Sequence, residues 1–378
     1  MKVPRVVIGM SGGVDSAVSA FLLKKRGYDV IGVHMINWDS QEEGISSCPR
    51  SKDEVDARSV CDKLKIPFHT VNFVKEYWNN VFLRFLENYQ FGRTTVPDID
   101  CNQSIKFDVF HKIAQEKFDA DFIATGHYAT TSFGDFQQNK NEPDEEIRLF
   151  SGRDPLKDQT FFLCTVTQEQ LRRAMFPLGS LYKSDVKRIA EEQGFHSVVQ
   201  KPESMGICFI GKKKRFSEFL DEYIEPKPGR IVLKDGKIIG NHHGIHQFTI
   251  GKRINGKYLE ERSHFGFFVS DIKPESGDVV ACEGSHHPHL YATKFLIEQP
   301  NWIPISNPLK SYPPSEIMCR IQRTHPPVPC ILEKCGDIIS VVPRLPLRAT
   351  APGQMCVFYT TKNECLGGGE IIKIQDTL

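Results

Sequence analysis

The sequence lacks the marks of several special protein classes. Its 48 basic and 47 acidic residues leave a net charge of +1. That sum excludes a protein that holds nucleic acid by bulk positive charge, but not one with a local basic groove. No apolar run approaches the roughly 18 residues of a membrane-spanning helix, so no membrane partner is expected. With 40% hydrophobic and 25% charged residues among 378, the chain is typical of a globular protein with two or three domains.

The eleven cysteines lack the spacing of a disulfide framework or a metal site. Their number is odd, no pair has C-x-x-C spacing, and the first residues do not resemble a secretory leader. A reducing compartment is therefore expected, with most cysteines buried as small core residues. Neither a structural zinc site nor a standard iron–sulfur cluster is indicated, so no metal ligands are predicted.

Short apolar runs alternate with amphipathic stretches over the first third of the chain. Buried strands are predicted at residues 5–10, 30–35, 68–73 and 121–125. Helices are predicted at residues 14–26, 53–65, 76–89 and 105–117. Strand–helix repeats of this kind predict an α/β domain whose parallel sheet is covered on both faces.

Beyond this region the pattern becomes β-rich. Residues 132–148 are polar and predict an exposed loop, and Ser184 is predicted to cap a helix that Gly194 ends. Short strands are predicted after about Gly211, at residues 230–233, 237–240, 267–271, 278–282, 330–332, 338–342, 355–359 and 369–374. The last of these segments fit a small barrel or sandwich.

The turn after the first predicted strand reads SGGVDS, at residues 11–16. Its glycines let the backbone approach an anion closely, and the following helix offers N–H groups at the positive end of its dipole. Asp15 can cap that helix or hold a magnesium ion carried by a nucleotide. The string lacks the lysine of the P-loop and does not match the dinucleotide-binding pattern. It resembles the SGGxDS loop of ATP pyrophosphatases, which release pyrophosphate while they adenylate a substrate.

That resemblance implies that ATP, with Mg²⁺, is a substrate, and no permanent prosthetic group is expected. Met35, at the end of the second predicted strand, resembles the residue beside the adenine, and Gly126 resembles another ATP contact. The residues assigned to ATP in this way are Gly9, Met10, Ser11, Gly12, Gly13, Val14, Asp15, Ser16, Met35 and Gly126.

Two cysteines stand in distinctive segments. Cys101 precedes the helix predicted at 105–117, and a helix dipole favours a thiolate at such a position. Asp98, three residues earlier, can handle a proton. Cys208 lies in an apolar segment bounded by glycines, at 206–211. Together with a phosphate loop, two cysteines can serve a reaction in which adenylation turns a carbonyl oxygen into a good leaving group and a thiolate or persulfide attacks.

Nearly the whole chain resembles the tRNA-specific 2-thiouridylases (the MnmA family), most of all their mitochondrial form. The matching stretches occur in family order between residues 8 and 369, and they are GMSGGVDSAV, NWDS, VKEYWNNVF, PDIDCNQSIKF, ATGHYA, KDQTFFL, FPLG, SMGICFIGK, PGQMCVFY and CLGGG. The resemblance implies an enzyme that uses ATP to activate O2 of the wobble uridine and then replaces that oxygen with sulfur. It also implies an ATP-pyrophosphatase catalytic domain at 1–211, a small central β-rich domain at 212–277 and a C-terminal β-barrel at 278–378.

The resemblance assigns roles to single residues. Cys208 resembles the cysteine that bears the incoming persulfide, and Asp98 resembles the acid/base residue. Cys101 resembles the nucleophile that completes sulfur release, through a transient disulfide with Cys208. The residues that resemble tRNA contacts are Val96, Pro97, Asp98, His127, Lys157, Asp158, Gln159, Arg323 and Gln354.

This chain departs from the family pattern in three places. Val96 stands where the family usually has an asparagine that holds the target base. Gln322-Arg323-Thr324 replaces an R-Y-R element of the barrel, and the second domain is shorter after residues 251–253. Val96 and Arg323 are therefore the predicted tRNA contacts at which this chain differs from the family pattern.

The implied partners are tRNA, of the kinds specific for Lys, Glu and Gln, and a persulfide donor fed by a cysteine desulfurase. Because the net charge is near zero, tRNA binding needs local basic clusters, for which the candidates are Lys183, Lys187, Arg188 and residues 212–215. A mitochondrial location is expected. Since the first strand begins by Arg5 and leaves no room for a conventional presequence, a bacterial cytoplasm is the alternative.

Three other interpretations stay open. An ATP pyrophosphatase that acts on a small metabolite would explain the loop but not the cysteine pair. A non-enzymatic nucleic-acid-binding protein is disfavoured by the intact SGGVDS. A thiouridylase with an iron–sulfur cluster would need a third cysteine, which folding would have to supply from Cys48 or Cys164, and analysis of metal and acid-labile sulfide would reveal it.

Overall fold

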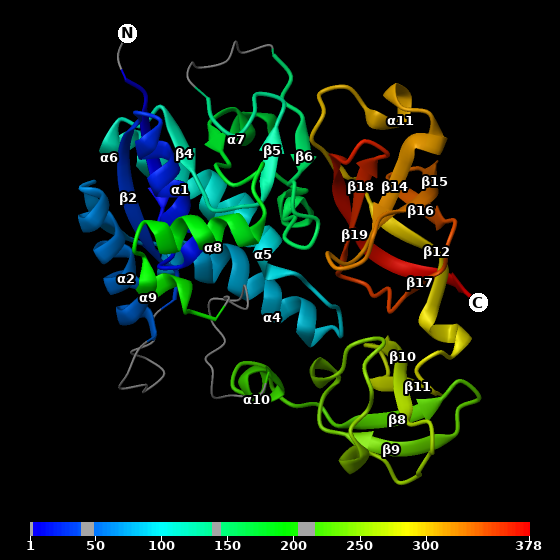
Figure 1. The fold of residues 1–378 in the computed structure, drawn as a ribbon. Helices are drawn as coiled ribbons and strands as arrows, with labels where there is room; N and C mark the ends of the chain where they lie inside the picture. The colour runs from blue at the N-terminus through cyan, green and yellow to red at the C-terminus, as the bar shows by residue number, and fades with distance from the viewer. Residues whose placement is uncertain (1–2, 39–48, 138–144, 203–215) are drawn as a thin grey trace.

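A computed structural model describes residues 3–38, 49–137, 145–202 and 216–378 (Figure 1). The first region is built on a five-stranded sheet with the strand order β3-β2-β1-β4-β7, in which every pairing is parallel. Its strands are β1 (Arg5–Gly9), β2 (Asp29–Ile36), β3 (Phe68–Asn72), β4 (Phe122–Ala124) and β7 (Ala174–Met175). The predicted parallel sheet is confirmed, because short continuous apolar runs are typical of strands buried on both faces.

Helices cover both faces of this sheet, as predicted. Val6 and Ile8 belong to one core cluster and Val7 belongs to the other, since successive side chains of a strand point to opposite faces. One face is covered by α1 (Val14–Lys25), α2 (Pro49–Leu64), α8 (Lys183–Glu192) and α9 (His196–Val199). The other is covered by α3 (Val74–Tyr77), the π-helical η1 (Trp78–Phe82), α4 (Leu83–Gln90), α6 (Phe110–Phe118) and α7 (Gln168–Arg172).

The helix predicted from residue 105 begins eight residues earlier. α5 (Pro97–Asp100) continues into the π-helical η2 (Cys101–Val109) and then into α6. Proline at the first helical position and aspartates in the first turn start the helix at Pro97, a pattern that the prediction overlooked. Cys101 therefore lies inside the helix, and its N–H donates to the carbonyl of Pro97.

The expected cap of α8 is also wrong. The helix begins at Lys183 with Tyr182 at its N-cap, and Ser184 lies within its first turn. The N–H of Tyr182 donates to Asp185 Oδ2 at 3.4 Å. The start of the helix is therefore capped by the carboxylate of Asp185 and not by the hydroxyl of Ser184. Gly194 ends the helical region with φ +68°, as predicted.

The middle of the chain forms a four-stranded sheet with the order β10-β11-β8-β9. Its strands are β8 (Gly229–Leu233), β9 (Ile238–His242), β10 (Phe267–Lys273) and β11 (Asp278–Glu283). β11 pairs with β8 in parallel and with β10 antiparallel. α10 (Phe216–Leu220) precedes this sheet and packs by Phe219 on the aromatic side chains of η1.

The C-terminal region is a β-barrel, as expected from its short strands. Its strands are β12 (Tyr291–Glu298), β13 (Asn301–Trp302), β14 (Ile317–Arg320), β15 (Val328–Cys335), β16 (Ile338–Pro343), β17 (Leu347–Arg348), β18 (Met355–Thr360) and β19 (Glu364–Thr377). The ladder runs β12-β16-β15-β14-β18-β19 and closes where β19 pairs with β12 again. α11 (Pro308–Ser311) lies beside it in Figure 1.

Two strands from the first region join the barrel sheet. β5 (Ala129–Thr131) pairs with β6 (Leu149–Ser151), and β6 pairs with the start of β19. The tract at 132–148 between them is therefore anchored at both ends: Gln137 and Ile147 are buried rather than exposed, and residues 138–144 lie outside the described ranges. Among the described residues, no helix combines the length and apolar character needed to cross a membrane.

Candidate active site

The SGGVDS segment forms a tight loop at the carboxyl end of β1. Gly12 has φ +74°, and a Cβ there would stand 2.3 Å from the carbonyl oxygen of Asp53. The Ser16 hydroxyl donates to the carbonyl of Gly13 at 3.1 Å and accepts from the N–H of Ser11 at 3.2 Å. Gly13 is the N-cap of α1 and offers no capping side chain. The loop thus presents backbone N–H groups at a helix N-terminus, as an anion site requires.

Two lysines from distant segments flank this loop. Lys183 Nζ lies 2.7 Å from both carboxylate oxygens of Asp15, and the Tyr128 hydroxyl donates to the same carboxylate at 2.8 Å. Lys201 Nζ donates to the carbonyl of Gly12 at 3.0 Å and to Asp53 Oδ1 at 2.7 Å. The structure thus removes Lys183 from the surface cluster proposed with Lys187 and Arg188, because its side chain points to Asp15 and is only 12% exposed.

The other residues assigned to ATP lie against the loop. A Cβ at Gly126 would stand 3.0 Å from the backbone of Asp15 and Ser16, so only glycine lets the end of β4 approach this closely. A Cβ at Gly9 would stand 3.1 Å from Cε of Met35, which places that side chain beside the end of β1. Met10 is buried, and its carbonyl contacts His34 Nδ1 at 2.8 Å. The ends of β1, β2 and β4 therefore meet where open α/β sheets bind ligands.

The segment after Gly126 leads from the loop to the cysteine helix. His127 is buried, and its Nδ1 lies 2.7 Å from Thr125 Oγ1. Burial lowers the pKa of His127 well below its usual value, and the positive charge of Lys106 lowers it further. The imidazole is therefore neutral near pH 7 and offers hydrogen bonds rather than charge.

Asp98, Cys101 and Lys106 lie along one continuous helix. Burial raises the pKa of Asp98 to about 6, and the nearby Lys106 ammonium opposes that rise. Lys106 Nζ also donates to Asn102 Oδ1 at 2.9 Å. Cys101 is buried, one helical turn from Asp98. Lys106 therefore lies near both Asp98 and His127, and the rings of Phe107 and His127, 5.9 Å apart, bring the cysteine helix against the segment that touches the phosphate loop.

The remaining predicted tRNA contacts divide into two groups. Asp158 is buried, accepts hydrogen bonds from Thr160, and pairs with Arg320 of the barrel at 2.6 Å. Gln354 is buried too, and its side chain accepts from the N–H of Ala351 at 2.9 Å. Both polar groups are thus engaged inside the protein, and their role toward tRNA stays a prediction.

Gln159, Lys157 and Arg323 lie closer to the surface. The N–H of Tyr128 donates to Gln159 Oε1 at 3.1 Å, which connects Gln159 to the segment beside the phosphate loop. Arg323 donates to the carbonyl of Leu156 at 2.8 Å and so holds the loop that carries Lys157. These contacts bring barrel and sheet together near the predicted tRNA contacts.

The start of the cysteine helix also touches the barrel. The N–H of Thr94 donates to the carbonyl of Pro352 at 2.8 Å, and a Cβ at Gly353 would stand 2.9 Å from the Thr94 carbonyl. Val96 and Pro97 follow directly, and Pro97 is buried. The barrel segment that carries Gln354 therefore lies next to the chain that enters the helix of Asp98 and Cys101.

Several predicted residues lie outside the described ranges. They are Cys208, Cys48 and the basic cluster at 212–215. Cys164 lies in the main core cluster, where burial raises the pKa of its thiol well above the usual value. Within the described part of the chain, no group of three or more His, Cys, Asp or Glu side chains is placed to hold a metal ion.

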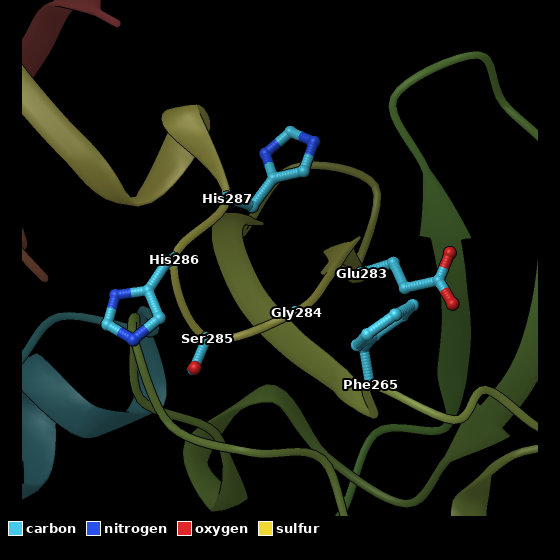
Figure 2. A pocket seen from close by; sticks show the side chains of 6 residues that line it. All are labelled: Phe265, Glu283, Gly284, Ser285, His286 and His287. Carbon is cyan, nitrogen blue, oxygen red and sulfur yellow. The ribbon is translucent and has the colours of Figure 1, made fainter.

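A hollow of about 370 Å³ opens elsewhere, on the middle sheet (Figure 2). It is lined by Phe265 and by the loop at 283–287, and the figure shows His286 and His287 pointing in different directions. None of its residues was predicted as a site residue. The predicted ATP-binding residues lie instead at the carboxyl ends of β1, β2 and β4.

Sequence reasoning did not identify two residues as parts of this site. Lys106 stands inside PDIDCNQSIKF, and its spacing of four from Asn102 and eight from Asp98 placed it on their helix face. Lys201 carries no local motif that would have revealed its contact with Gly12.

Comparisons with known proteins cover almost the whole chain. Three family models match, described as a tRNA methyl transferase HUP domain at residues 4–212, a tRNA methyl transferase PRC-barrel domain at 217–283 and an aminomethyltransferase beta-barrel domain at 292–371. The first spans the sheet and the phosphate loop, the second the four-stranded sheet and the third the barrel.

Relatives match the chain from end to end. The Caenorhabditis elegans protein named "Probable mitochondrial tRNA-specific 2-thiouridylase 1" is 79% identical over 375 residues, 99% of this chain and 100% of that protein. The human mitochondrial tRNA-specific 2-thiouridylase 1 is 43% identical over 388 residues, 98% of this chain and 90% of that protein. The tRNA-specific 2-thiouridylase MnmA of Vibrio cholerae is 42% identical over 379 residues, 97% of this chain and 96% of that protein.

Proposed function

Since the chain belongs to the tRNA-specific 2-thiouridylase family, we propose that it is a tRNA-uridine 2-sulfurtransferase that adenylates O2 of the wobble uridine and replaces it with persulfide sulfur. The products are 2-thiouridine, AMP and pyrophosphate. The single observation that carries this proposal is the continuity of the site. Gly126 packs against the phosphate loop, and the ring of the next residue, His127, lies 5.9 Å from that of Phe107 on the helix of Asp98 and Cys101.

The loop supports the ATP step. Its backbone N–H groups and the N-terminus of α1 suit the phosphates, and Gly126 packs directly against the loop. Asp15 is the loop's carboxylate and is the group suited to the Mg²⁺ that ATP carries. Adenylation is needed because a uridine carbonyl oxygen is a poor leaving group, whereas AMP is a good one.

The cysteines carry the sulfur. The terminal sulfur of a Cys208 persulfide attacks C2 of the adenylated uridine, and AMP leaves with the original oxygen. The Cys101 thiolate then attacks the Cys208 sulfur and breaks the S–S bond to the base, which leaves 2-thiouridine and a Cys101–Cys208 disulfide. An external dithiol must reduce that disulfide before the next turnover. The Cα atoms of the two residues must come within roughly 7 Å.

Asp98 serves proton transfer in this scheme. With a pKa of about 6 it is mostly ionised near pH 7 yet more basic than an exposed aspartate. It can therefore accept the proton of Cys101, one turn away on the same helix. Lys106 keeps the carboxylate ionised, and the neutral His127 offers hydrogen bonds to the base.

The proposed partners follow from the family. We assign tRNAs for Lys, Glu and Gln as substrates, a desulfurase-fed persulfide protein as donor, and the mitochondrion as location, because the C. elegans and human relatives carry mitochondrial names. The three-domain division at residues 211 and 277 belongs to the same proposal.

The test is thiolation in vitro. Transcribed tRNA is incubated with the protein, Mg²⁺, ATP and a persulfide donor, and thiolated tRNA is detected by its retardation in a mercury-containing gel. Retarded tRNA together with AMP and pyrophosphate is the expected result. Products of ADP and phosphate would refute the adenylation step, and unretarded tRNA would refute the sulfur transfer.

A further inference from the structure

The phosphate loop contains no lysine, but the fold brings one to it. Lys183 is the first residue of α8, 168 positions beyond Asp15 in sequence. Its Nζ lies 2.7 Å from both oxygens of the Asp15 carboxylate. The lysine side chain is 12% exposed and the aspartate side chain 33%, so the pair stands at the opening of the loop rather than in the core.

We propose that Lys183 is the phosphate-binding lysine of this site and binds the β- and γ-phosphates of ATP, while Asp15 holds its place when no nucleotide is bound. The inference rests on the proposed use of ATP. It assigns to Lys183 a part in nucleotide binding instead of the tRNA contact that the sequence suggested.

The charges around the loop favour this assignment. Asp15 alone would give the loop a negative charge that repels a triphosphate, and Lys183 neutralises it. When ATP enters with Mg²⁺, the cation can take the place of Lys183 at Asp15, and the ammonium then becomes available to the phosphates. The Tyr128 hydroxyl, which donates to Asp15 at 2.8 Å, keeps the carboxylate oriented through this exchange. Only side-chain rotation of a four-carbon stem is needed.

Lys201 does not fit the same role. Its ammonium pairs with both Asp53 and Asp56 and donates to the carbonyl of Gly12. Two carboxylates already exceed its single charge, so moving it would leave them unpaired beside the incoming phosphates. We assign Lys201 to positioning the loop.

Isothermal titration of the full chain with ATP·Mg²⁺ and with AMP distinguishes a phosphate contact from a structural one. Lys183→Ala is expected to weaken ATP binding about 10- to 100-fold, the range of charge-assisted hydrogen bonds, while AMP binding stays within about twofold. Lys183→Arg, which keeps the charge, is expected to retain part of the ATP affinity. Lys112→Ala, an exposed lysine on α6, is the matched control and should bind both nucleotides like the wild type.

Three other outcomes would each contradict the inference. Equal ATP affinity in Lys183→Ala and wild type refutes the phosphate contact. Equal loss of ATP and AMP affinity shows a merely structural role and refutes it as well, and thermal unfolding of the variant reports whether the fold has suffered. A wild-type chain that binds neither nucleotide refutes the ATP step of the proposed function, and the inference fails with it.

Discussion

Two carboxylates of the same α/β region, the buried Asp158 and the partly buried Asp98, have opposite surroundings. Asp158, at the contact with the barrel, accepts hydrogen bonds from the N–H and hydroxyl of Thr160 and pairs with Arg320 at 2.6 Å. The carboxylate of Asp98, on the cysteine helix, accepts no hydrogen bond from any described residue, and burial raises its pKa to about 6. The protein thus supplies partners to one carboxylate, whereas burial shifts the pKa of the other.

The difference distinguishes polar groups that are fully paired within the protein from polar groups that can still accept a proton or a ligand. A buried charge whose partners are all supplied by the protein ties two regions together and has little left to offer a substrate. A partly buried carboxylate with a single nearby cation, such as Asp98 with Lys106, keeps both a raised pKa and oxygens to which no described residue donates. This contrast gives physical grounds to weigh the predicted site residues, because Asp158 belongs to the first kind and Asp98 to the second.

The cysteines should show the contrast most strongly. Cys101→Ser, in the reactive region, is expected to lower thiolation by at least about 10³-fold, since a serine hydroxyl cannot resolve the disulfide-linked intermediate. Cys208→Ser should do the same, because it removes the persulfide carrier. Both variants should still adenylate the uridine and release pyrophosphate, and Cys101→Ser, which keeps the persulfide carrier, should also release AMP. The mercury gel measures thiolation, and nucleotide chromatography measures these products.

Cys365, which lies where the barrel contacts the α/β region, is the matched control for Cys101. Burial raises the pKa of its thiol to about 12, and the thiol lies 3.7 Å from the carbonyl of Thr160. Cys365→Ser should keep near-normal thiolation per folded molecule, as should Cys335→Ser at the exposed end of β15. Near-normal thiolation by Cys101→Ser with a physiological donor would mean that the mechanism is wrong at that residue.

Breaking the ion pair of Asp158 and Arg320 should lower the free energy of unfolding. Asp158→Ala leaves the Arg320 guanidinium buried without its carboxylate and is expected to destabilise the protein by about 3–5 kcal/mol. The double variant Asp158→Leu with Arg320→Met should lose much less, because it removes both charges at similar volume. Urea unfolding of the wild type, of Asp158→Leu, of Arg320→Met and of the double variant gives the coupling energy. A coupling energy near zero would show that this contact does not join barrel and sheet.

Removing the carboxylate of Asp98 should lower the rate of thiolation. Asp98→Asn keeps the shape but cannot accept a proton, so kcat/KM for thiolation is expected to fall about 10²-fold. In the wild type, kcat/KM should decline as the pH falls below about 6, where Asp98 becomes protonated. The variant's remaining activity should lack that decline. A variant with the wild-type pH profile would assign the proton transfer to another group.

Local patterns were enough to predict the strands and the loop. The runs at residues 5–10 and 30–35 are buried strands because their apolar side chains cover both faces of a parallel sheet. SGGVDS forms the expected tight turn between β1 and α1 because glycine alone tolerates φ +74° at Gly12 beside the Asp53 carbonyl. Both features depend on residues that lie within a few positions of one another.

Contacts between distant segments could not be predicted in the same way. Lys183 and Asp15 are 168 positions apart, and Asp158 and Arg320 are 162 apart. No local periodicity reports that such side chains meet, and the pairing of β6 with β19 is of the same kind. The roles of Asp98, Cys101 and Cys208 came from the family motifs and remain proposals, as do the domain boundaries.

The smallest expected effect is a pH dependence of stability that belongs to Asp98 alone. Its pKa in the folded protein, about 6, exceeds the ordinary value of 3.8, so the native state binds the proton more tightly than the unfolded state does. The resulting stabilisation is fully present below pH 4 and is lost as the pH rises through 6. Discounted for the partial exposure of the side chain, its size is about 1–2 kcal/mol.

Asp98→Asn tests this directly. The variant has no proton to bind, so its free energy of unfolding relative to the wild type should rise by about 1–2 kcal/mol between pH 4 and pH 7. Urea unfolding at several pH values measures the difference, in which acid effects at other sites cancel. Asp100 is present in both proteins, and burial raises its pKa to about 6 as well, so its contribution cancels too. Asp62→Asn, at an exposed position on α2, is the control for the substitution itself. A flat difference for Asp98→Asn would mean that burial does not raise the pKa of Asp98, and the contrast with Asp158 would then rest on hydrogen bonding alone.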